Sequence, residues 1–256
     1  MKRLFKAAAV AAVSLALSGA AQAQSALNQI LSDGVLKVGT TGDWNPMTVR
    51  DPATNSYKGF DIDIMTELAT DLGVEVEFVP TDWKTLVNGV VAGQYHITGS
   101  ASISPARMKA AGFSESYISV EIMPFTSKEG AGKFAGHDAI NQPGVKVATT
   151  LGTTFEKLVR EWYPNADIKV VEAPARGYQE VLAGRADVFI TSNIEGSTLT
   201  EKFGVAAVDG AEARAPTPIA MLLPQDDQVW INYVNNWVKV KEAMGFFDAN
   251  KAKWGL

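Results

Sequence analysis

A run of small hydroxyl residues followed by a single arginine is the part of the chain whose residue types best suit chemistry. Ser100, Ser102 and Ser104 follow a short apolar strand that we expect to end at Ile97, and Arg107 lies two residues beyond a proline. A carboxylate is bound well by the planar fork of an arginine together with short hydroxyl donors. A helix that begins at the proline would add partial positive charge from its N–H groups. The segment predicts an anion site centred on Arg107, with a solvated helix arginine beside loop serines as the alternative.

A second candidate position follows the strand expected at residues 35–39. Asp43 and Trp44 stand in the polar loop after it. Ligands of open α/β sheets collect at the carboxyl ends of strands, which places both side chains where a site would be. Turn capping by the aspartate and loop anchoring by the tryptophan are the alternatives.

The second half of the chain contributes two further polar segments. Thr153 and Thr154 end a tight turn between a strand at residues 144–150 and a helix at 155–162. Such a turn offers N–H groups and hydroxyls to an anion, and its lack of a P-loop lysine argues against nucleoside triphosphates. Ser192, Asn193 and Glu195 follow the strand that begins near Val188, at a position that corresponds to Ser100 and Ser102 in the first half.

The elements that must position these residues alternate between strands and helices. Apolar residues at helical spacing predict a helix from Gly59 to Leu72, closed by Gly73, between strands at residues 35–39 and 74–79. A helix from residues 81–83 to 92–93 follows, and residues 51–58 are expected to form a hairpin tip. This βαβα order predicts an α/β fold with a largely parallel sheet.

An internal similarity predicts two lobes. Residues 91–97 and 182–188 each read as a helix end, a glycine turn and a strand, followed in each case by polar residues. We expect lobe 1 to comprise residues 24–124 plus 217–256 and lobe 2 to comprise 125–216, with the polar segments facing one another across a cleft. Crossovers near residues 122–127 and 211–219 would form the hinge.

The N-terminus predicts export. Residues 1–23 combine three cations, an apolar run and Ala21-Gln22-Ala23, which is typical of a cleaved secretory signal peptide, so a periplasmic location is expected. Cleavage leaves 20 basic against 28 acidic residues, an acidic balance that argues against nucleic acid as a partner. The chain has no cysteine and two histidines, so neither a disulfide framework nor a histidine-rich metal site is expected, and no cofactor is implied.

The helix GFDIDIMTELATDL, the segment from Ser102 to Arg107 and the FSESY segment at residues 113–117 together resemble the bacterial extracellular solute-binding proteins of family 3. The resemblance implies a type II periplasmic binding protein fold that closes on a small carboxylated solute, an amino acid or a similar compound, and delivers it to an ABC transporter permease in the inner membrane. It also implies that Arg107 and Ser102 hold the carboxylate, that Thr153 or Thr154 adds donors, and that Trp44 or Trp83 stacks on the ligand. A monomer is expected.

One position departs from the pattern of amino acid binders. They usually carry an aspartate for the ligand's ammonium where this chain has Ser192. Either Glu195 or Asp43 substitutes for it, or the ligand has no primary ammonium. An aromatic rim of Trp44 and Trp83, with Tyr57 as a further candidate, would suit a quaternary ammonium.

A second resemblance is to periplasmic cyclohexadienyl dehydratases, which share this fold. The segment Thr40-Thr41-Gly42-Asp43 and the position of Glu195 are similar to their sites. In such an enzyme Glu195 would act as general acid and Asp43 would position the substrate. Ser192 and the turn at residues 149–154 depart from the enzyme pattern, and a helix-start carboxylate is the alternative role for Glu195. Binding is the preferred interpretation, because the shared motifs serve binding in both cases.

Overall fold

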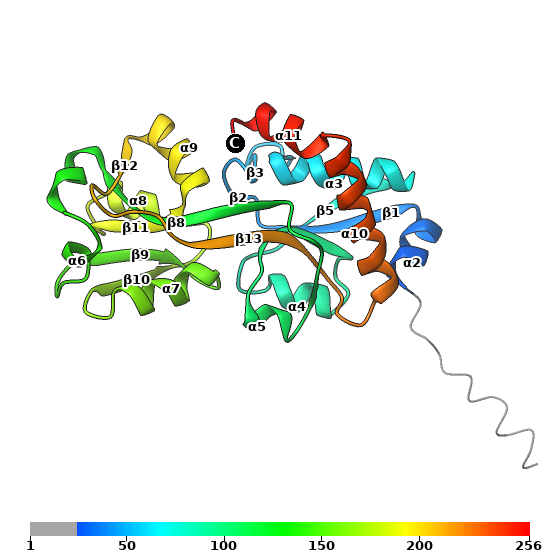
Figure 1. Cartoon of the computed structure of the whole chain (residues 1–256), viewed down its shortest axis with the longest axis horizontal. Coiled ribbons are helices and arrows are strands. Elements are labelled where there is room, and N and C mark those ends of the chain that lie inside the picture. Colours follow the sequence, from blue (N-terminus) through cyan, green and yellow to red (C-terminus); the bar gives the residue numbers. More distant parts are fainter. Residues whose placement is uncertain (1–24) are drawn as a thin grey trace, which may run out of the picture.

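A curved, mixed sheet runs through the whole molecule in the computed structural model, which describes residues 25–256 (Figure 1). The strand order is β10-β9-β11-β8-β13-β6-β1-β5, with β12 beside β8 and β7 beside β13. At its centre β8 (Ile118–Ser127) and β13 (Arg214–Leu223) are antiparallel and continue into both ends of the molecule. The expected signal peptide lies outside the described residues.

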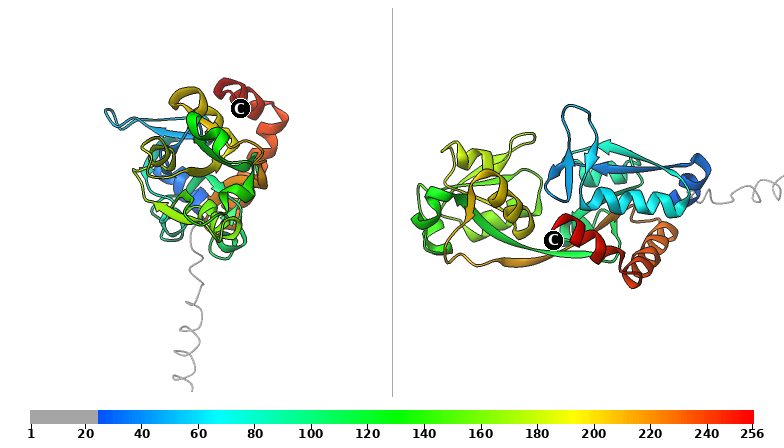
Figure 2. Two further views of the ribbon diagram at one scale, coloured as in Figure 1. Left: turned by 90° about the vertical axis from the view of Figure 1, so that its left-hand side faces the viewer. Right: turned by 90° about the horizontal axis from the view of Figure 1, so that it is seen from above.

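Lobe 1 is built around the parallel strands β1 (Val35–Thr40), β5 (Glu75–Pro80) and β6 (Ile97–Ser102). Its other elements are α2 (Ala26–Asp33), α3 (Phe60–Leu72), α4 (Leu86–Val91), α5 (Pro105–Met108), β7 (Gly112–Phe113), α10 (Gln228–Ala243) and α11 (Phe246–Trp254). A small antiparallel sheet of β2 (Asp43–Trp44), β3 (Thr48–Arg50) and β4 (Tyr57–Lys58) forms the expected hairpin. In Figure 2 the C-terminal helices α10 and α11 lie beside α2 and α3, which belong to this part of the chain.

Lobe 2 repeats the arrangement with strands β9 (Lys146–Thr150), β10 (Asp167–Val171) and β11 (Val188–Ser192), also parallel to one another. Its other elements are the 3-10 helix η1 (Lys128–Lys133), α6 (His137–Ile140), α7 (Thr154–Trp162), α8 (Gly177–Leu182), α9 (Asn193–Phe203) and β12 (Val205–Ala207). The α/β class and the two-lobed fold are therefore confirmed. The residue boundaries between the lobes stay a prediction, because β8 and β13 run through both without a break.

The helix α3 shows why the pattern of its sequence was informative. Ile64, Met65 and Leu68 are buried in the core of lobe 1, as the helical spacing requires. Gly73 ends the helix in the left-handed conformation, with φ of 70°, and its N–H returns to the carbonyl of Ala69. Burial of these side chains holds α3 against the sheet, and the N–H groups of Phe60 and Asp61 at its start donate to the carbonyls of Pro46 and Met47, which follow β2.

Two expectations about local structure were wrong. The strand that was expected to end at Ile97 begins there and extends to Ser102, because β13 pairs with it from Thr98 to Ser102. The helix expected from residues 81–83 begins at Leu86, because the Asp82 carboxylate accepts hydrogen bonds from the Thr85 N–H and hydroxyl and holds a turn instead. Helix α11 was not expected, and α9 was expected only in the alternative in which Glu195 stands at a helix start. Across residues 25–256, none of the helices has the length and apolar character needed to cross a membrane.

Candidate ligand-binding site

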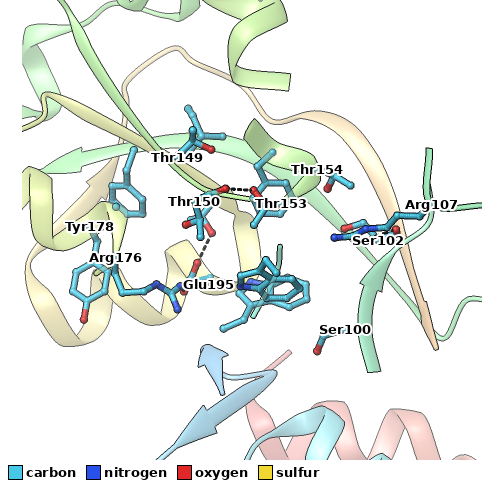
Figure 3. A pocket seen from close by; sticks show the side chains of 17 residues that line it. Ser100, Ser102, Arg107, Thr149, Thr150, Thr153, Thr154, Arg176, Tyr178 and Glu195 are labelled. Atoms are coloured by element: carbon cyan, nitrogen blue, oxygen red, sulfur yellow. Dashed lines mark hydrogen bonds and ion pairs between the residues drawn. The ribbon is translucent and has the colours of Figure 1, made fainter. Parts of the chain in front are cut away.

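A cavity of about 40 Å³ lies between the lobes, at the carboxyl ends of the strands in both (Figure 3). Lobe 1 contributes Trp44, Trp83, Ser100, Ser102 and Arg107. Lobe 2 contributes Thr149, Thr150, Thr153, Thr154, Phe155, Arg176, Gly177, Tyr178, Phe189, Ile190, Thr191 and Glu195. The cavity thus brings together most of the side chains that the sequence singled out, from segments far apart along the chain.

Arg107 lies at one end of this cavity (Figure 3). The short helix α5 begins after Ser104, whose hydroxyl accepts the Arg107 N–H at 3.4 Å. The side chain of Arg107 is buried, with 8% of the residue exposed, and its Nη1 donates to the carbonyl of Ser102 at 3.2 Å. No carboxylate of residues 25–256 pairs with it, and burial alone lowers the pKa of its guanidinium to about 10. Arg107 is therefore charged at neutral pH, and most of its guanidinium N–H groups have no anionic partner among the described residues.

Ser100 is held in an unusual conformation beneath the cavity. Its φ is +59°, in the left-handed region, where β6 has an irregular register against β13. Its hydroxyl donates to Asp61, its N–H donates to the Tyr117 hydroxyl at 2.9 Å, and that hydroxyl donates to Asp61 at 2.7 Å. Burial raises the pKa of Asp61 to about 6. The hydroxyl of Ser100, which was expected to contact the ligand, therefore already donates to Asp61.

The opposite end of the cavity contains a network of charges around Arg176. Its Nη2 donates to Oε1 of Glu195, and its Nη1 lies 3.2 Å from Oδ2 of Asp43 in the other lobe. The second oxygen of Glu195 accepts a hydrogen bond from the Thr191 hydroxyl. Both expected carboxylates are therefore paired with the same buried arginine.

The protonation of this network follows from burial and pairing together. Burial disfavours the charge of Arg176, but Glu195 and Asp43 outweigh it, so the pKa of Arg176 is raised. Burial also raises the pKa of Glu195, while Arg176 and the hydroxyl of Thr191 oppose that shift. The arginine therefore favours the ionised form of a carboxyl whose charge burial disfavours.

The two tryptophans form an aromatic wall of the cavity. The rings of Trp44 and Trp83 lie edge to face, with centroids 6.0 Å apart, and Nε1 of Trp83 donates to Oδ1 of Asp43 at 2.9 Å. Tyr57, the further candidate for an aromatic cage, packs against Phe78 and is not among the lining residues. The described residues thus place two aromatic rings beside the ligand position, at a steep angle to each other.

Two of the expected ligand residues make hydrogen bonds within the protein and are not among the residues that line the cavity. Ser192 is fully buried and begins α9, where its hydroxyl accepts the N–H of Glu195 and Nε1 of Trp44, both at 3.2 Å. Asn193 lies outside the cavity and accepts the N–H of Glu121. Thr153 begins α7 in the same way as Ser192 begins α9, while both it and Thr154 line the cavity.

Several contacts join the two lobes directly. Besides the Asp43 to Arg176 ion pair and the Trp44 to Ser192 hydrogen bond, the Lys84 ammonium contacts Glu172 at the surface. The backbone of Lys84 also lies so close to Gly152 that a Cβ there would be 2.6 Å from its N and Cα atoms. The lobes are therefore in a closed arrangement around the cavity.

Sequence reasoning missed Arg176. It stands in the segment EAPARGYQ, between a strand and a helix, without the hydroxyl run that made Arg107 conspicuous. The signal available was its place just before α8, which corresponds to the site-forming turn before α7. Nothing local indicated that it would reach Asp43 in the other lobe. Among residues 25–256 no group of three or more His, Cys, Asp or Glu side chains is arranged to hold a metal ion.

Two lobes of similar α/β construction that enclose a small polar cavity define a binding-protein architecture. The chain belongs to the bacterial extracellular solute-binding proteins, family 3, whose model matches residues 36–256. The type II periplasmic binding protein fold expected from the sequence is thereby confirmed.

Similar proteins include both binders and an enzyme. The cyclohexadienyl dehydratase of Pseudomonas aeruginosa is 32% identical over 249 residues, which cover 96% of this chain and 92% of that protein. A crystal structure of an ancestral amino acid-binding protein, AncCDT-1, described as a precursor of cyclohexadienyl dehydratase, is 35% identical with a TM-score of 0.84 and covers 90% of this chain and 99% of that one. A point variant of an ancestral cyclohexadienyl dehydratase, AncCDT-3, is 40% identical with a TM-score of 0.55 and covers 91% and 97%. Amino acid binding and dehydratase chemistry thus both occur among the relatives.

Proposed function

We propose that this protein is the periplasmic solute-binding component of an ABC importer, and that it captures a small carboxylated solute, an amino acid or a similar compound, by closing its lobes. The family membership supports the transport role, and the expected signal peptide at residues 1–23 supports the location. Lobe closure would present a different surface to a permease in the inner membrane, which is how binding would be read. The proposal assigns no cofactor and no nucleic acid partner.

Arg107 is the observation that carries this proposal. A buried guanidinium without a carboxylate partner in residues 25–256 is costly, and a ligand carboxylate would compensate it with a bidentate pair. Ser102 lies beside it, and Thr153 and Thr154 line the facing wall. The ligand body would lie against Trp44 and Trp83, between the two ends of the cavity.

The direct test is calorimetric titration of the purified protein with a panel of small carboxylates. Arg107→Ala should weaken the best ligand by about 2–5 kcal/mol, or roughly 30- to 5,000-fold, because it removes one partner of a desolvated charge pair. Arg160→Ala is the matched control, since Arg160 is a half-exposed arginine that pairs with Glu156 on the outside of α7. Equal affinities of the Arg107→Ala protein and the wild type would contradict the assignment.

A dehydratase is the second candidate, favoured by Glu195. This buried carboxyl lines the cavity opposite Arg107, and burial raises its pKa, as a general acid requires. It would protonate the hydroxyl that leaves prephenate as water while carbon dioxide is lost. Binding remains preferred because Arg176 donates to Glu195 and favours its ionised form.

Incubation with prephenate, followed by the absorbance of phenylpyruvate, separates the two functions. Enzymatic turnover that disappears in Glu195→Gln would make the protein a dehydratase. Binding of carboxylates without turnover would leave the transport function.

A further inference from the structure

Arg176 occupies the position that the amino group of a ligand would need in order to pair with a carboxylate of the protein. It lies at the end of the cavity opposite Arg107 and contacts one carboxylate from each lobe, Asp43 and Glu195. Only 15% of its side chain is exposed, so its charge is shared with these two acids rather than with solvent. An amino group in the ligand would have to displace this guanidinium to obtain an anionic partner.

Three of the four carboxylate oxygen atoms of the two acids accept hydrogen bonds. Glu195 accepts from Arg176 at one oxygen and from Thr191 at the other. Asp43 accepts from Trp83 at Oδ1, and its Oδ2 faces Nη1 of Arg176 at 3.2 Å. That last contact is an ion pair without hydrogen-bond alignment, so Oδ2 of Asp43 is the atom at which an amine would compete.

The remaining polar groups suit an oxygen function. Ser192 is fully buried and accepts two hydrogen bonds from the protein, from Trp44 and from the N–H of Glu195. Thr149, which is buried in the cavity wall, has a hydroxyl with no hydrogen-bond partner among residues 25–256, and such a hydroxyl can donate to a carbonyl or hydroxyl oxygen. An ammonium buried here would leave N–H donors unpaired, which is costly.

We infer that Arg176 determines specificity by pairing with Glu195, which lines the cavity, and with Asp43 beside it, and that the solute is a carboxylate without an ammonium group, such as a 2-oxo or 2-hydroxy acid. This inference rests on the proposed function and narrows its ligand class. It assigns the carboxylate to Arg107 and the neutral, oxygen-bearing part of the ligand to the region between the two tryptophans and Thr149. Arg176 neutralises the two carboxylates itself, so an ammonium group of the ligand is not needed to pair with them.

The test compares pairs of ligands that share a carbon skeleton and differ only in the amine. Phenylpyruvate against phenylalanine and 2-oxoglutarate against glutamate serve as probes, with glycine betaine as a carboxylate whose cation has no N–H. In whichever pair binds, the oxo acid should bind the wild-type protein at least about tenfold tighter, which is the cost of about one unmade buried hydrogen bond. Tighter binding of the amino acid, or of betaine than of every oxo acid, would overturn the inference.

The second test is a variant that is expected to gain affinity for amino acids. Arg176→Met frees both acids, so the ratio of affinities should shift at least about tenfold toward the amino acid member, and basic amino acids should begin to bind. An unchanged ratio in the folded variant would also overturn the inference, and if the variant does not fold, the wild-type pairs decide. Failure of the proposed function would look different: Arg107→Ala would then leave the affinity of the best ligand unchanged, whichever member of a pair that ligand is.

Discussion

The two ends of the cavity each contain a buried arginine, yet the protein treats them differently. Arg176 is paired with two carboxylates, whereas Arg107 has only the carbonyl of Ser102 among the described residues. Burial lowers the pKa of Arg107 to about 10, while the pKa of Arg176 is raised because its two acids outweigh burial. A buried charge that the protein compensates belongs to its own structure, and one that it leaves uncompensated belongs to the ligand. This difference is the reason for proposing that the Arg107 end of the cavity receives the anion.

The largest expected effect is on stability, when the two arginines are removed in turn. Arg176→Ala would leave Glu195 and Asp43 buried without a cation and should lower the free energy of unfolding by about 3–5 kcal/mol. Arg107→Ala removes a charge that has no protein partner among residues 25–256, so the free energy of unfolding should stay unchanged or rise. Urea unfolding of both variants beside the wild type measures this. Equal losses in the two variants would show that the ends of the cavity do not differ as described.

Asp61 extends the comparison to acids, because it is a buried carboxyl with only neutral donors, Ser100 and Tyr117, among the described residues. Its pKa is about 6 in the folded protein against an ordinary value of 3.8, so the folded state holds this proton more tightly than the unfolded chain. The stability it contributes is fully present below about pH 3.8 and is lost as the pH rises through about 6. The whole change corresponds to about 3 kcal/mol.

The measurement is the free energy of unfolding at pH 4 and pH 7 for the wild type and for Asp61→Asn, which cannot titrate. The wild type should lose more stability between these values than the variant does, by most of the expected change. An equal change in the free energy of unfolding of the two proteins between pH 4 and pH 7 would contradict the raised pKa of Asp61.

A smaller effect is expected where the lobes touch away from both arginines. Gly152 and Gly144 both have positive φ, of 78° and 83°, so alanine is strained at either position. Only at Gly152 would the new Cβ meet backbone, that of Lys84 across the cleft, whereas nothing lies within 4 Å at Gly144. Gly152→Ala should therefore weaken ligand binding by about 1–3 kcal/mol through hindered closure, and Gly144→Ala should not.

Titration of the ligand and small-angle scattering of the liganded proteins measure closure in this pair. The Gly152→Ala protein should have the larger radius of gyration with ligand present. Equal affinities of the two glycine variants would mean that closure tolerates a methyl group at this contact.

The sequence predicted the parts of the site that depend on local order. Arg107 could be assigned because serines, a proline and an arginine follow one strand, and α3 because its apolar spacing is regular. Arg176 could not, because its partner Asp43 is more than a hundred residues away and only the closed lobes bring them together. The ligand contacts of Ser100 and Ser192 stay predictions, but the protein partners of their hydroxyls, Asp61 and Trp44, come from elsewhere in the fold and could not be predicted. The type of a buried polar residue predicts that its side chain will form a hydrogen bond or an ion pair. Which residue it pairs with is determined by the tertiary structure.

The hydrogen bond between the indole of Trp44 and Ser192 has an optical consequence. The ring belongs to lobe 1 and its N–H partner to lobe 2, and only 4% of Trp44 is exposed when the lobes are together. Separation of the lobes breaks this bond and admits water to the indole, which shifts its emission to longer wavelength. If solute capture closes the lobes as proposed, the fluorescence of Trp44 reports it without an attached dye.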